Sequence, residues 1–264
     1  VKSSYGGAIY VAAGNLRLDE TGLSSNSAIS GKTITTGTGS PFPGFSAFGG
    51  AVYNGGGSVW ITNSTLTGNL ARGGVGLFLG IGFTPGPAGH GFGGAVYSEG
   101  SLSVVNSTLH GNSAEGGPVQ RSTCPAGNGI GGGIHNNGGS LLVNYSTLAM
   151  NRGMATVGGA PGTGFSLGSA VYSTNGAASI HASLFGYSSF GSKVFATFAD
   201  NGYNLSSDSS ANFTGPGSLN NTDPKLGPFD NYGGHTRTMV LLSGSSAIDA
   251  GDPANCLATD QRGH

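Results

Sequence analysis

Residues 49–69 read GGAVYNGGGSVWITNSTLTGN, and both halves of this stretch recur along the chain. Copies of the first half begin at Gly6, Gly49, Gly93, Gly131 and Gly168. Their starts are therefore separated by 43, 44, 38 and 37 residues. Copies of the second half follow at Asn15, Ser58, Ser101, Ser140 and Ala178. A two-part motif repeated with this period indicates a solenoid built from stacked turns.

Each copy predicts one turn of a three-sided coil. Side chains alternate between the two faces of a strand, so Val59 and Ile61 share the inward face of one strand. Leu66 would point inward from the next strand, and the Gly- and Asn-containing segments between strands supply the bends. We therefore predict an all-β fold, a right-handed parallel β-helix (β-solenoid), with three short strands in each rung of about 21 residues.

Stacking of the turns would bury side chains that a single turn leaves exposed, because each turn pairs its backbone with the next about 4.8 Å away. Equivalent residues then lie in rows, with Ile61 next to Val104. Two rows of asparagines are predicted at corners of the coil, where stacked amides hydrogen-bond to one another. One row consists of Asn63, Asn106 and Asn144, and the other of Asn69, Asn112 and Asn151.

The segments between one rung and the next are rich in Gly, Pro and large apolar residues, for example at 40–48 and 77–92. They leave the coil at the same corner, so we expect long Gly/Phe-rich loops on one flank. Either these loops form a second layer on the coil, or their aromatic side chains contact another copy of the chain. The residues predicted to take part in such self-association are Phe42, Phe45, Phe78 and Phe83.

The composition fits this fold and excludes several classes of partner. Glycine accounts for 53 of the 264 residues and charged residues for only 8%, whereas about 25% charged residues is usual. Ten scattered basic residues do not make a phosphate-binding surface, so no nucleic-acid partner is expected. No apolar run reaches the roughly 20 residues that span a bilayer. Because the chain starts at Val1, almost directly in a repeat, we interpret it as part of a longer protein.

The repeats resemble those of bacterial surface proteins with right-handed β-helices, such as the polymorphic outer membrane proteins. The C-terminal region is similar to the choice-of-anchor Q domain in four segments, TDPKLGP at 222–228, DNYGGHT at 230–236, GSSAIDAGD at 244–252 and the residues 256–263. The resemblance implies rung repeats over residues 1–192, which the region 193–264 continues or caps. It also implies an extracellular or bacterial cell-surface location, and it supplies no catalytic residues.

Cysteine usage leaves two alternatives open. Cys124 and Cys256 are too few thiols for a zinc site built on thiolates. They could form a disulfide in an oxidising compartment, or they could be two unrelated thiols. Recurrence of N-x-[ST] triplets in the repeat is explained by the predicted asparagine row, so acceptor sites for glycosylation are sought outside it. Those candidates are Asn204, Asn212 and Asn220.

Enzymes that cleave polysaccharides need carboxylates at defined positions. From residue 21 to residue 192 the acids are Glu99 and Glu115, and neither belongs to a predicted strand-borne cluster. In the C-terminal region Asp residues could hold a structural Ca²⁺, or cap turns through hydrogen bonds to nearby N–H groups. The three in question are Asp249, Asp252 and Asp260. We favour turn capping and predict no cofactor, metal ligand or catalytic residue.

These observations predict a structural or adhesive module of the cell surface that can self-associate into filaments. Its expected partners are other copies of the chain and glycans or a surface matrix. The alternative is a carbohydrate-active β-helix, either a polysaccharide lyase or hydrolase or a glycan-binding protein.

Overall fold

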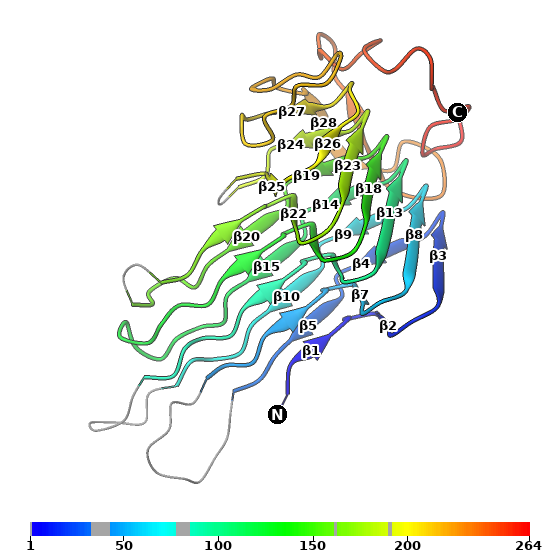
Figure 1. Cartoon of the computed structure of the whole chain (residues 1–264). Coiled ribbons are helices and arrows are strands. Elements are labelled where there is room, and N and C mark those ends of the chain that lie inside the picture. Colours follow the sequence, from blue (N-terminus) through cyan, green and yellow to red (C-terminus); the bar gives the residue numbers. More distant parts are fainter. Residues whose placement is uncertain (1, 33–42, 78–84, 161–162, 190–191) are drawn as a thin grey trace.

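The computed structural model describes residues 2–32, 43–77, 85–160, 163–189 and 192–264. In this part of the chain the regular elements are strands, and none is an α-helix. The strands stack as a parallel β-solenoid of about four turns, which confirms the predicted fold class (Figure 1). The N-terminus lies at one end of the stack, and the C-terminal residues lie beside the coil, where they contact its second and third turns.

One complete turn contains five strands, so the prediction of three strands per rung was incomplete. In the second turn they are β6 (Ala47–Phe48), β7 (Val52–Asn54), β8 (Ser58–Thr62), β9 (Thr65–Thr67) and β10 (Leu70–Arg72). β7, β8 and β9 are the predicted strands, whereas β6 and β10 lie in segments expected to be loops. These two short strands have no clear apolar alternation, which is the signal that sequence patterns use to detect strands.

Equivalent strands of successive turns form five parallel sheets, named A to E here in chain order. Sheet A contains β1 (Ser4–Tyr5), β6, β11 (Gly91–Phe92), β16 (Gly129–Ile130) and β21 (Ser166–Leu167). Sheet B contains β2 (Ile9–Val11), β7, β12 (Val96–Ser98), β17 (Ile134–Asn137), β22 (Val171–Thr174) and β25 (Val194–Ala196). Sheet C contains β3 (Asn15–Asp19), β8, β13 (Ser101–Val105), β18 (Leu141–Asn144), β23 (Ala178–His181) and β26 (Ala199–Asp200). Sheet D contains β4 (Gly22–Ser24), β9, β14 (Thr108–His110), β19 (Thr147–Ala149), β24 (Leu184–Gly186) and β27 (Leu205–Ser206). Sheet E contains β5 (Ser27–Ile29), β10, β15 (Ser113–Glu115) and β20 (Arg152–Met154).

The hydrophobic core lies between sheets B, C and D. Ile61 pairs in register with Val104, and Val104 with Val143, and all three side chains are fully buried. A second row stacks the buried leucines Leu66, Leu109 and Leu148 in the same way. Both rows confirm the predicted strand faces. Burial of each such side chain contributes roughly 1.5–3 kcal/mol relative to exposure, so the rows stabilise every interface between turns.

Sheets A and E extend from the core as a thin flange, toward the lower left of Figure 1. Where they meet, the two backbones approach so closely that only glycine fits. A Cβ on Gly94 would lie 2.1 Å from the carbonyl oxygen of Gly132 and 2.5 Å from the main-chain carbon of Ser113. The small side chains of Ala28, Ala47 and Ala71 fill a separate apolar cluster in the flange. This close approach accounts for the second glycine of the GGAVY motif, whereas the first, as at Gly93, has a positive φ of 65°.

The second predicted asparagine row is a continuous ladder at the corner between sheets D and E. Asn69 Nδ2 donates to Asn112 Oδ1 over 2.8 Å, and Asn112 Nδ2 donates to Asn151 Oδ1 over 2.9 Å. All three side chains are fully buried, and Asn26 extends the ladder by one turn. Each of the three amides also donates to a leucine carbonyl oxygen, so its polar atoms are satisfied in the core.

The first predicted row is correct for Asn63 and Asn106 but wrong for Asn144. Asn106 Nδ2 donates to Asn63 Oδ1 over 2.8 Å, and both residues have a φ of 50°. In the next turn the equivalent residue is Tyr145, also with a φ of 50°. Asn144 instead pairs with Val105, one position earlier, and its Oδ1 is buried without a hydrogen-bond partner in the described part of the chain. The prediction followed the N-x-[ST] pattern, whereas the inward apolar side chains set the register.

The end of the coil farther from the N-terminus is covered by the chain itself. After β27, a short stretch places Phe213 against the core, where its side chain is only 4% exposed. The Phe213 ring packs on Phe185 and Phe198, with centroids 5.7 and 5.6 Å apart. Asp200 anchors this cap by accepting a hydrogen bond from the main-chain N–H of Thr214 over 2.7 Å. Burial alone raises the pKa of Asp200, but hydrogen bonds from main-chain N–H and polar side-chain groups hold it below its ordinary value.

We expect Gly94→Ala to lower the free energy of unfolding by about 3 kcal/mol or more, because the new Cβ would collide with main-chain atoms of two neighbouring strands. Gly22→Ala is the matched control: no atom lies within 4 Å of a Cβ at Gly22, so its effect should stay within about 0.5 kcal/mol. Urea unfolding of the two variants measures the difference. Equal stabilities would contradict the close approach of sheets A and E.

Candidate functional site

The residues 223–264, called the C-terminal strap here, fold back along the outer face of sheet D. They contain an antiparallel hairpin of β28 (Leu226–Asp230) and β29 (Thr238–Leu241). Hydroxyl groups of successive turns hold the strap: Thr65 Oγ1 donates to the Arg237 carbonyl oxygen over 2.6 Å. The strap therefore brings side chains from distant parts of the sequence together, and the spaces beneath it are candidate binding sites.

Gln261 is the central attachment of the strap. Its Oε1 accepts a hydrogen bond from Thr108 Oγ1 over 2.7 Å. Its Nε2 lies 2.9 Å from Thr65 Oγ1 and 2.8 Å from Thr236 Oγ1. One amide side chain thus bridges two neighbouring turns of sheet D and the hairpin, between two clefts.

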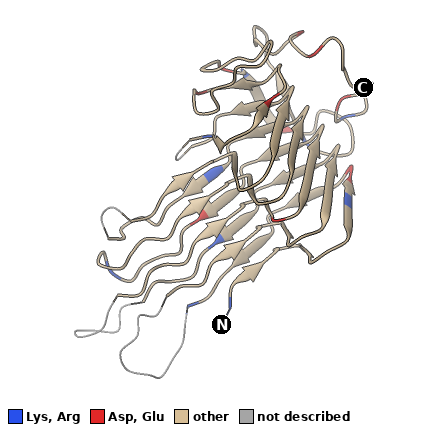
Figure 2. Cartoon of the chain, in the orientation of Figure 1, with Lys and Arg blue, Asp and Glu red and all other residues tan. Residues whose placement is uncertain are grey.

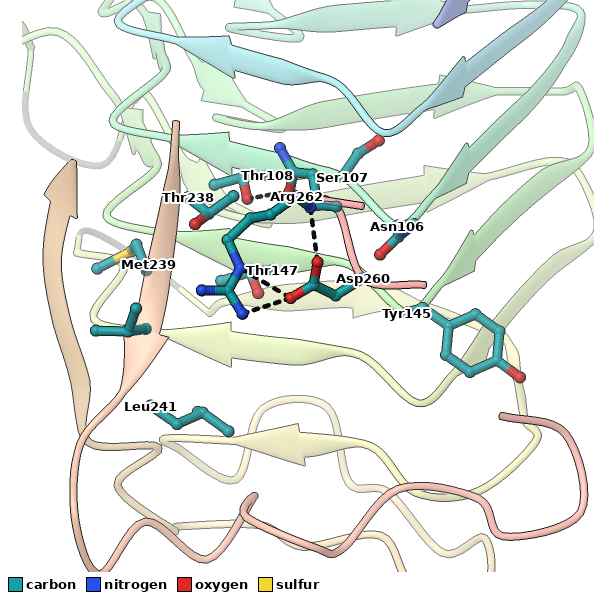
Figure 3. Close-up of a pocket in the computed structure, with 12 residues that line it drawn as sticks. Asn106, Ser107, Thr108, Tyr145, Thr147, Thr238, Met239, Leu241, Asp260 and Arg262 are labelled. Atoms are coloured by element: carbon teal, nitrogen blue, oxygen red, sulfur yellow. Dashed lines mark hydrogen bonds and ion pairs between the residues drawn. The ribbon is translucent and has the colours of Figure 1, made fainter. Parts of the chain in front are cut away.

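The central cleft has a volume of about 480 Å³ and lies between sheet D and the strap (Figure 3). The coil contributes hydroxyl groups to its lining, including those of Thr108 and Thr147. Met239 of β29 and the Asp260–Arg262 pair line it from the strap. This mixture of hydroxyl, charged and apolar groups can orient a polar ligand.

The Asp260 carboxylate in this cleft is already engaged. Its Oδ2 accepts hydrogen bonds from Arg262 Nε and Nη2 over 2.8 and 2.6 Å, and its Oδ1 accepts one from the Arg262 main-chain N–H. Partial burial raises the pKa of Asp260, but the bonds from Arg262 and from the His264 N–H lower it below its ordinary value. A carboxylate held charged and paired in this way is poorly suited to act as a general acid.

A second cleft of about 590 Å³ lies next to the first, on the other side of Gln261. The His110 ring stacks on Phe229 with a centroid distance of 4.2 Å, and the Arg237 guanidinium lies 6.0 Å from the same ring. Burial lowers the pKa of His110, so its imidazole is neutral at pH 7. Thr67 lines the cleft from the coil, with Oγ1 3.5 Å from His110 Nδ1.

A third feature lies away from the strap, in the angle between the flange and the coil. The rings of Tyr53 and Tyr97 stack along the outer face of sheet B, with centroids 5.4 Å apart and planes at 5°. Phe48 and Phe92 of sheet A stack beside them at 5.2 Å, and Phe48 meets the Tyr97 ring at 73°. We call these stacked side chains the aromatic seam, and its full set is Tyr5, Phe48, Phe92, Tyr10, Tyr53, Tyr97, His135, Tyr172 and Phe195.

The two cysteines do not form the possible disulfide. Both are free thiols, Cys124 buried near the flange and Cys256 exposed in the strap. The alternative of two unrelated thiols therefore holds in this structure.

The residues predicted for self-association and for glycosylation differ in how exposed they are. Phe42, Phe78 and Phe83 lie outside the described residues, and Phe45 is partly buried. Asn204 is only 1% exposed and its Nδ2 donates to the Ile180 carbonyl oxygen, so the folded chain does not present it to a glycosyltransferase. The Asn220 amide is hydrogen-bonded to the main chain of Phe213 through both polar atoms, whereas Asn212 is exposed.

Two of the three aspartates considered for calcium are used in other ways, whereas Asp249 is exposed, with a φ of 56°. Asp252 accepts hydrogen bonds from the Ala254 N–H and from Asn255 Nδ2, and its Oδ2 lies 3.3 Å from His181 Nε2. Asp260 is paired with Arg262 as described above. Within the described ranges, no group of three or more His, Cys, Asp or Glu side chains is placed to hold a metal ion.

Sequence reasoning missed the aromatic seam and Gln261. The fifth residue of each GGAVY copy and the aromatic residue directly before the Gly pair were visible signals for the seam, as in Phe48-Gly49 and Phe92-Gly93. Gln261 had no such signal, because its partners belong to turns far away in the chain.

Comparisons with protein-family models, with curated proteins and with solved structures found no match to this chain. Among the described residues, no helix has the length and apolar character required to cross a membrane.

We expect Gln261→Ala to release the strap from sheet D without unfolding the coil, because it removes hydrogen bonds to two turns and to the hairpin. Limited proteolysis followed by mass measurement should show faster cleavage within residues 223–264 and an intact coil. The matched control, Gln120→Ala, lies on the flange side of the chain and should be cleaved in the strap at the wild-type rate. Identical rates for all three proteins would show that Gln261 does not hold the strap.

Proposed function

We propose that the chain is an extracellular, cell-surface module with a structural and adhesive role. Its stiff solenoid displays the same kinds of outward side chains at regular spacing, and a repeated surface can bind an extended partner at several points at once. Similarity of the repeats and of the C-terminal region to bacterial surface proteins, on the residues quoted above, supports the location.

The main observation behind this proposal is that most acidic side chains already have hydrogen-bond or ion-pair partners within the chain. Ten of the eleven accept a hydrogen bond or form an ion pair in the described structure. Glu115 pairs with Arg72 at 2.6 Å, and Asp208 pairs with Lys193 at 2.8 Å. Charged residues are sparse on the coil and form no extended patch (Figure 2). Side chains committed to folding in this way favour a scaffold over a hydrolytic site.

The second candidate is a carbohydrate-active protein. The specific observation in its favour is the pair of clefts beneath the strap, which combine hydroxyl groups, Arg237, Arg262 and aromatic rings. Such groups suit sugar hydroxyls and carboxylates, so polysaccharide lyase, hydrolase and glycan-binding roles are outcomes of the same test.

We expect the chain to adhere to immobilised polysaccharides or bacterial cell-wall material without degrading them, because most of its carboxylates already accept hydrogen bonds or form ion pairs within the described structure. Retention on a panel of neutral and acidic polysaccharides measures adhesion, and heat-unfolded chain is the control. The same incubations are followed for new reducing ends and for unsaturated uronates. Product formation would support the carbohydrate-active alternative, and a chain that neither adheres nor cleaves would contradict both.

Self-association is the second part of this proposal. The strands β1 to β5 of the first turn each have a neighbour on one side only. The inward side chains Ile9, Leu16 and Leu23 of that turn are only partly buried in the described stretch of chain, where a turn packs on one side of them. Another copy stacking on this edge would cover the side chains and pair the strand edges, as unprotected edges tend to do.

Light scattering at rising protein concentration should therefore show growing particles for the wild-type chain. Leu23→Lys should keep the chain monomeric, because a charge would then lie in the contact between copies. Leu257→Lys makes the same change of charge in the exposed strap and should associate like the wild type. A wild-type chain that stays monomeric at high micromolar concentration would rule out assembly through this edge.

A further inference from the structure

The part of the aromatic seam that lies on sheet B is interrupted in a single turn. Along sheet B, Tyr53 stacks on Tyr97 at 5.4 Å and Tyr172 stacks on Phe195 at 5.1 Å, with ring planes within 7° in both pairs. Between the two pairs lies His135, whose smaller ring is turned by 62° and 69° relative to its two neighbours. In the same turn Ile130 takes the place that Phe92 holds in sheet A. The sheet B row therefore lacks a parallel six-membered ring at one level, whereas the sheet A row has no ring after Phe92, because Ile130 and then Leu167 follow it in register.

A hollow of about 380 Å³ lies at this interruption, and its walls include Phe92, Tyr97, Ile130, His135 and Tyr172. Tyr97 and Tyr172 belong to turns two steps apart, which corresponds to about 9.6 Å along the axis. Rings elsewhere in the seam are about one step apart. The His135 ring fills the inner part of this interval, with its centroid 5.0 and 4.9 Å from those of Tyr97 and Tyr172, so the hollow lies outside this smaller ring, bordered by the two tyrosines.

Polar groups surround the hollow on the side away from the flange. Asn137 and Thr174 line it directly, and Asn137 Nδ2 donates to the Tyr97 hydroxyl oxygen over 3.0 Å. The Tyr97 hydroxyl in turn donates to Glu99 Oε1 over 3.0 Å. His135 is 6% exposed, and its Nδ1 has no hydrogen-bond partner in the described part of the chain. Aromatic walls with a few fixed polar groups are typical of small-molecule sites.

The charges near the hollow narrow the class of ligand. Burial lowers the pKa of His135 to about 3, so its imidazole carries no charge at pH 7. Burial raises the pKa of Tyr97 to about 12, with Glu99 adding to the increase. No Lys or Arg lines the hollow, and the nearest charge described is the Glu99 carboxylate. This arrangement disfavours uronates, phosphates and nucleotides, since each would bring a negative charge close to Glu99.

We propose that this hollow binds one ring of an uncharged, extended glycan, which completes the interrupted stack of the seam. The inference rests on the adhesive function proposed above and names its partner class. A sugar ring matches both features of the site, because its C–H face packs on aromatic side chains and its hydroxyl groups bond to Asn137 and Thr174. An aromatic side chain from a peptide would fill the space but would form no hydrogen bonds to Asn137 or Thr174.

The test measures binding to the full chain by calorimetry and by ligand-observed NMR. The neutral probes are cellohexaose, xylohexaose and mannohexaose; hexagalacturonate and a phenylalanine-containing hexapeptide are the competing ligands. At least one neutral hexasaccharide should bind, and hexagalacturonate at least tenfold more weakly. His135→Tyr should restore the continuous stack, fill the hollow and weaken binding at least tenfold, while the melting temperature stays equal or rises.

The matched control is His264→Tyr, which makes the same substitution at an exposed position that lines neither cleft beneath the strap and should bind like the wild type. Should His135→Tyr fail to fold, Thr174→Val tests the same site, because it keeps the side-chain shape and removes one hydroxyl from the rim; it should weaken binding at least threefold. Unchanged affinity in the folded variants, preferred binding of hexagalacturonate or the peptide, or no binding of any neutral probe would each overturn the proposal.

The outcome is separable from that of the adhesive function. If the wild type and His135→Tyr adhere equally to immobilised polysaccharides, adhesion stands and the hollow is not its binding site. If the chain binds a neutral hexasaccharide through the hollow but does not adhere to surfaces, the site stands and the adhesive role fails.

Discussion

Parallel backbone pairing between successive turns, about 4.8 Å apart, places each side chain beside its equivalent in the next turn. Each residue type in the repeat must therefore be able to pack against, or hydrogen-bond to, an identical or similar side chain in the next turn. Apolar rows such as Ile61, Val104 and Val143 meet this condition by packing, and the Asn69–Asn112–Asn151 ladder meets it through amide hydrogen bonds. Like charges stacked at this distance would repel one another, which is consistent with the small share of charged residues in the chain.

The same pairing explains the division between coil and flange. In the coil, large inward side chains keep the sheets apart around a core. In the flange, sheets A and E bring their backbones together, and positions such as Gly94 leave no room for a Cβ. The aromatic seam lies where these two regions meet. Neighbouring turns bury its rings: Tyr53 is 8% and Tyr97 4% exposed, with a turn on each side, while Tyr10, which has a neighbouring turn on one side, is 58% exposed.

The local surface shapes proposed above as binding sites arise where the chain departs from the repeat. His135 interrupts a row of tyrosines, and the strap covers one face of an otherwise uniform sheet with a non-repeating sequence. The clefts beneath the strap and the hollow at His135 form because the sequence at these places departs from the repeat of the other turns. A perfectly regular repeat presents identical rows of side chains along its whole length, whereas a residue or segment that breaks the repeat gives the surface a distinct local shape.

The sequence by itself determined the parallel β-solenoid, the inward faces of β8, β13 and β18, and the Asn69 ladder, because period and alternation are local properties that stacking must preserve. It did not reveal β6 and β10, whose short Gly- and Ala-rich segments have no apolar alternation, and it placed Asn144 one position out of register. Only the tertiary structure decided that Cys124 and Cys256 stay apart, that Asn204 is buried, and that Gln261 joins the strap to two turns of sheet D. These facts depend on contacts between segments far apart in the chain, and no local pattern encodes which face of the coil a non-repeating tail will cover.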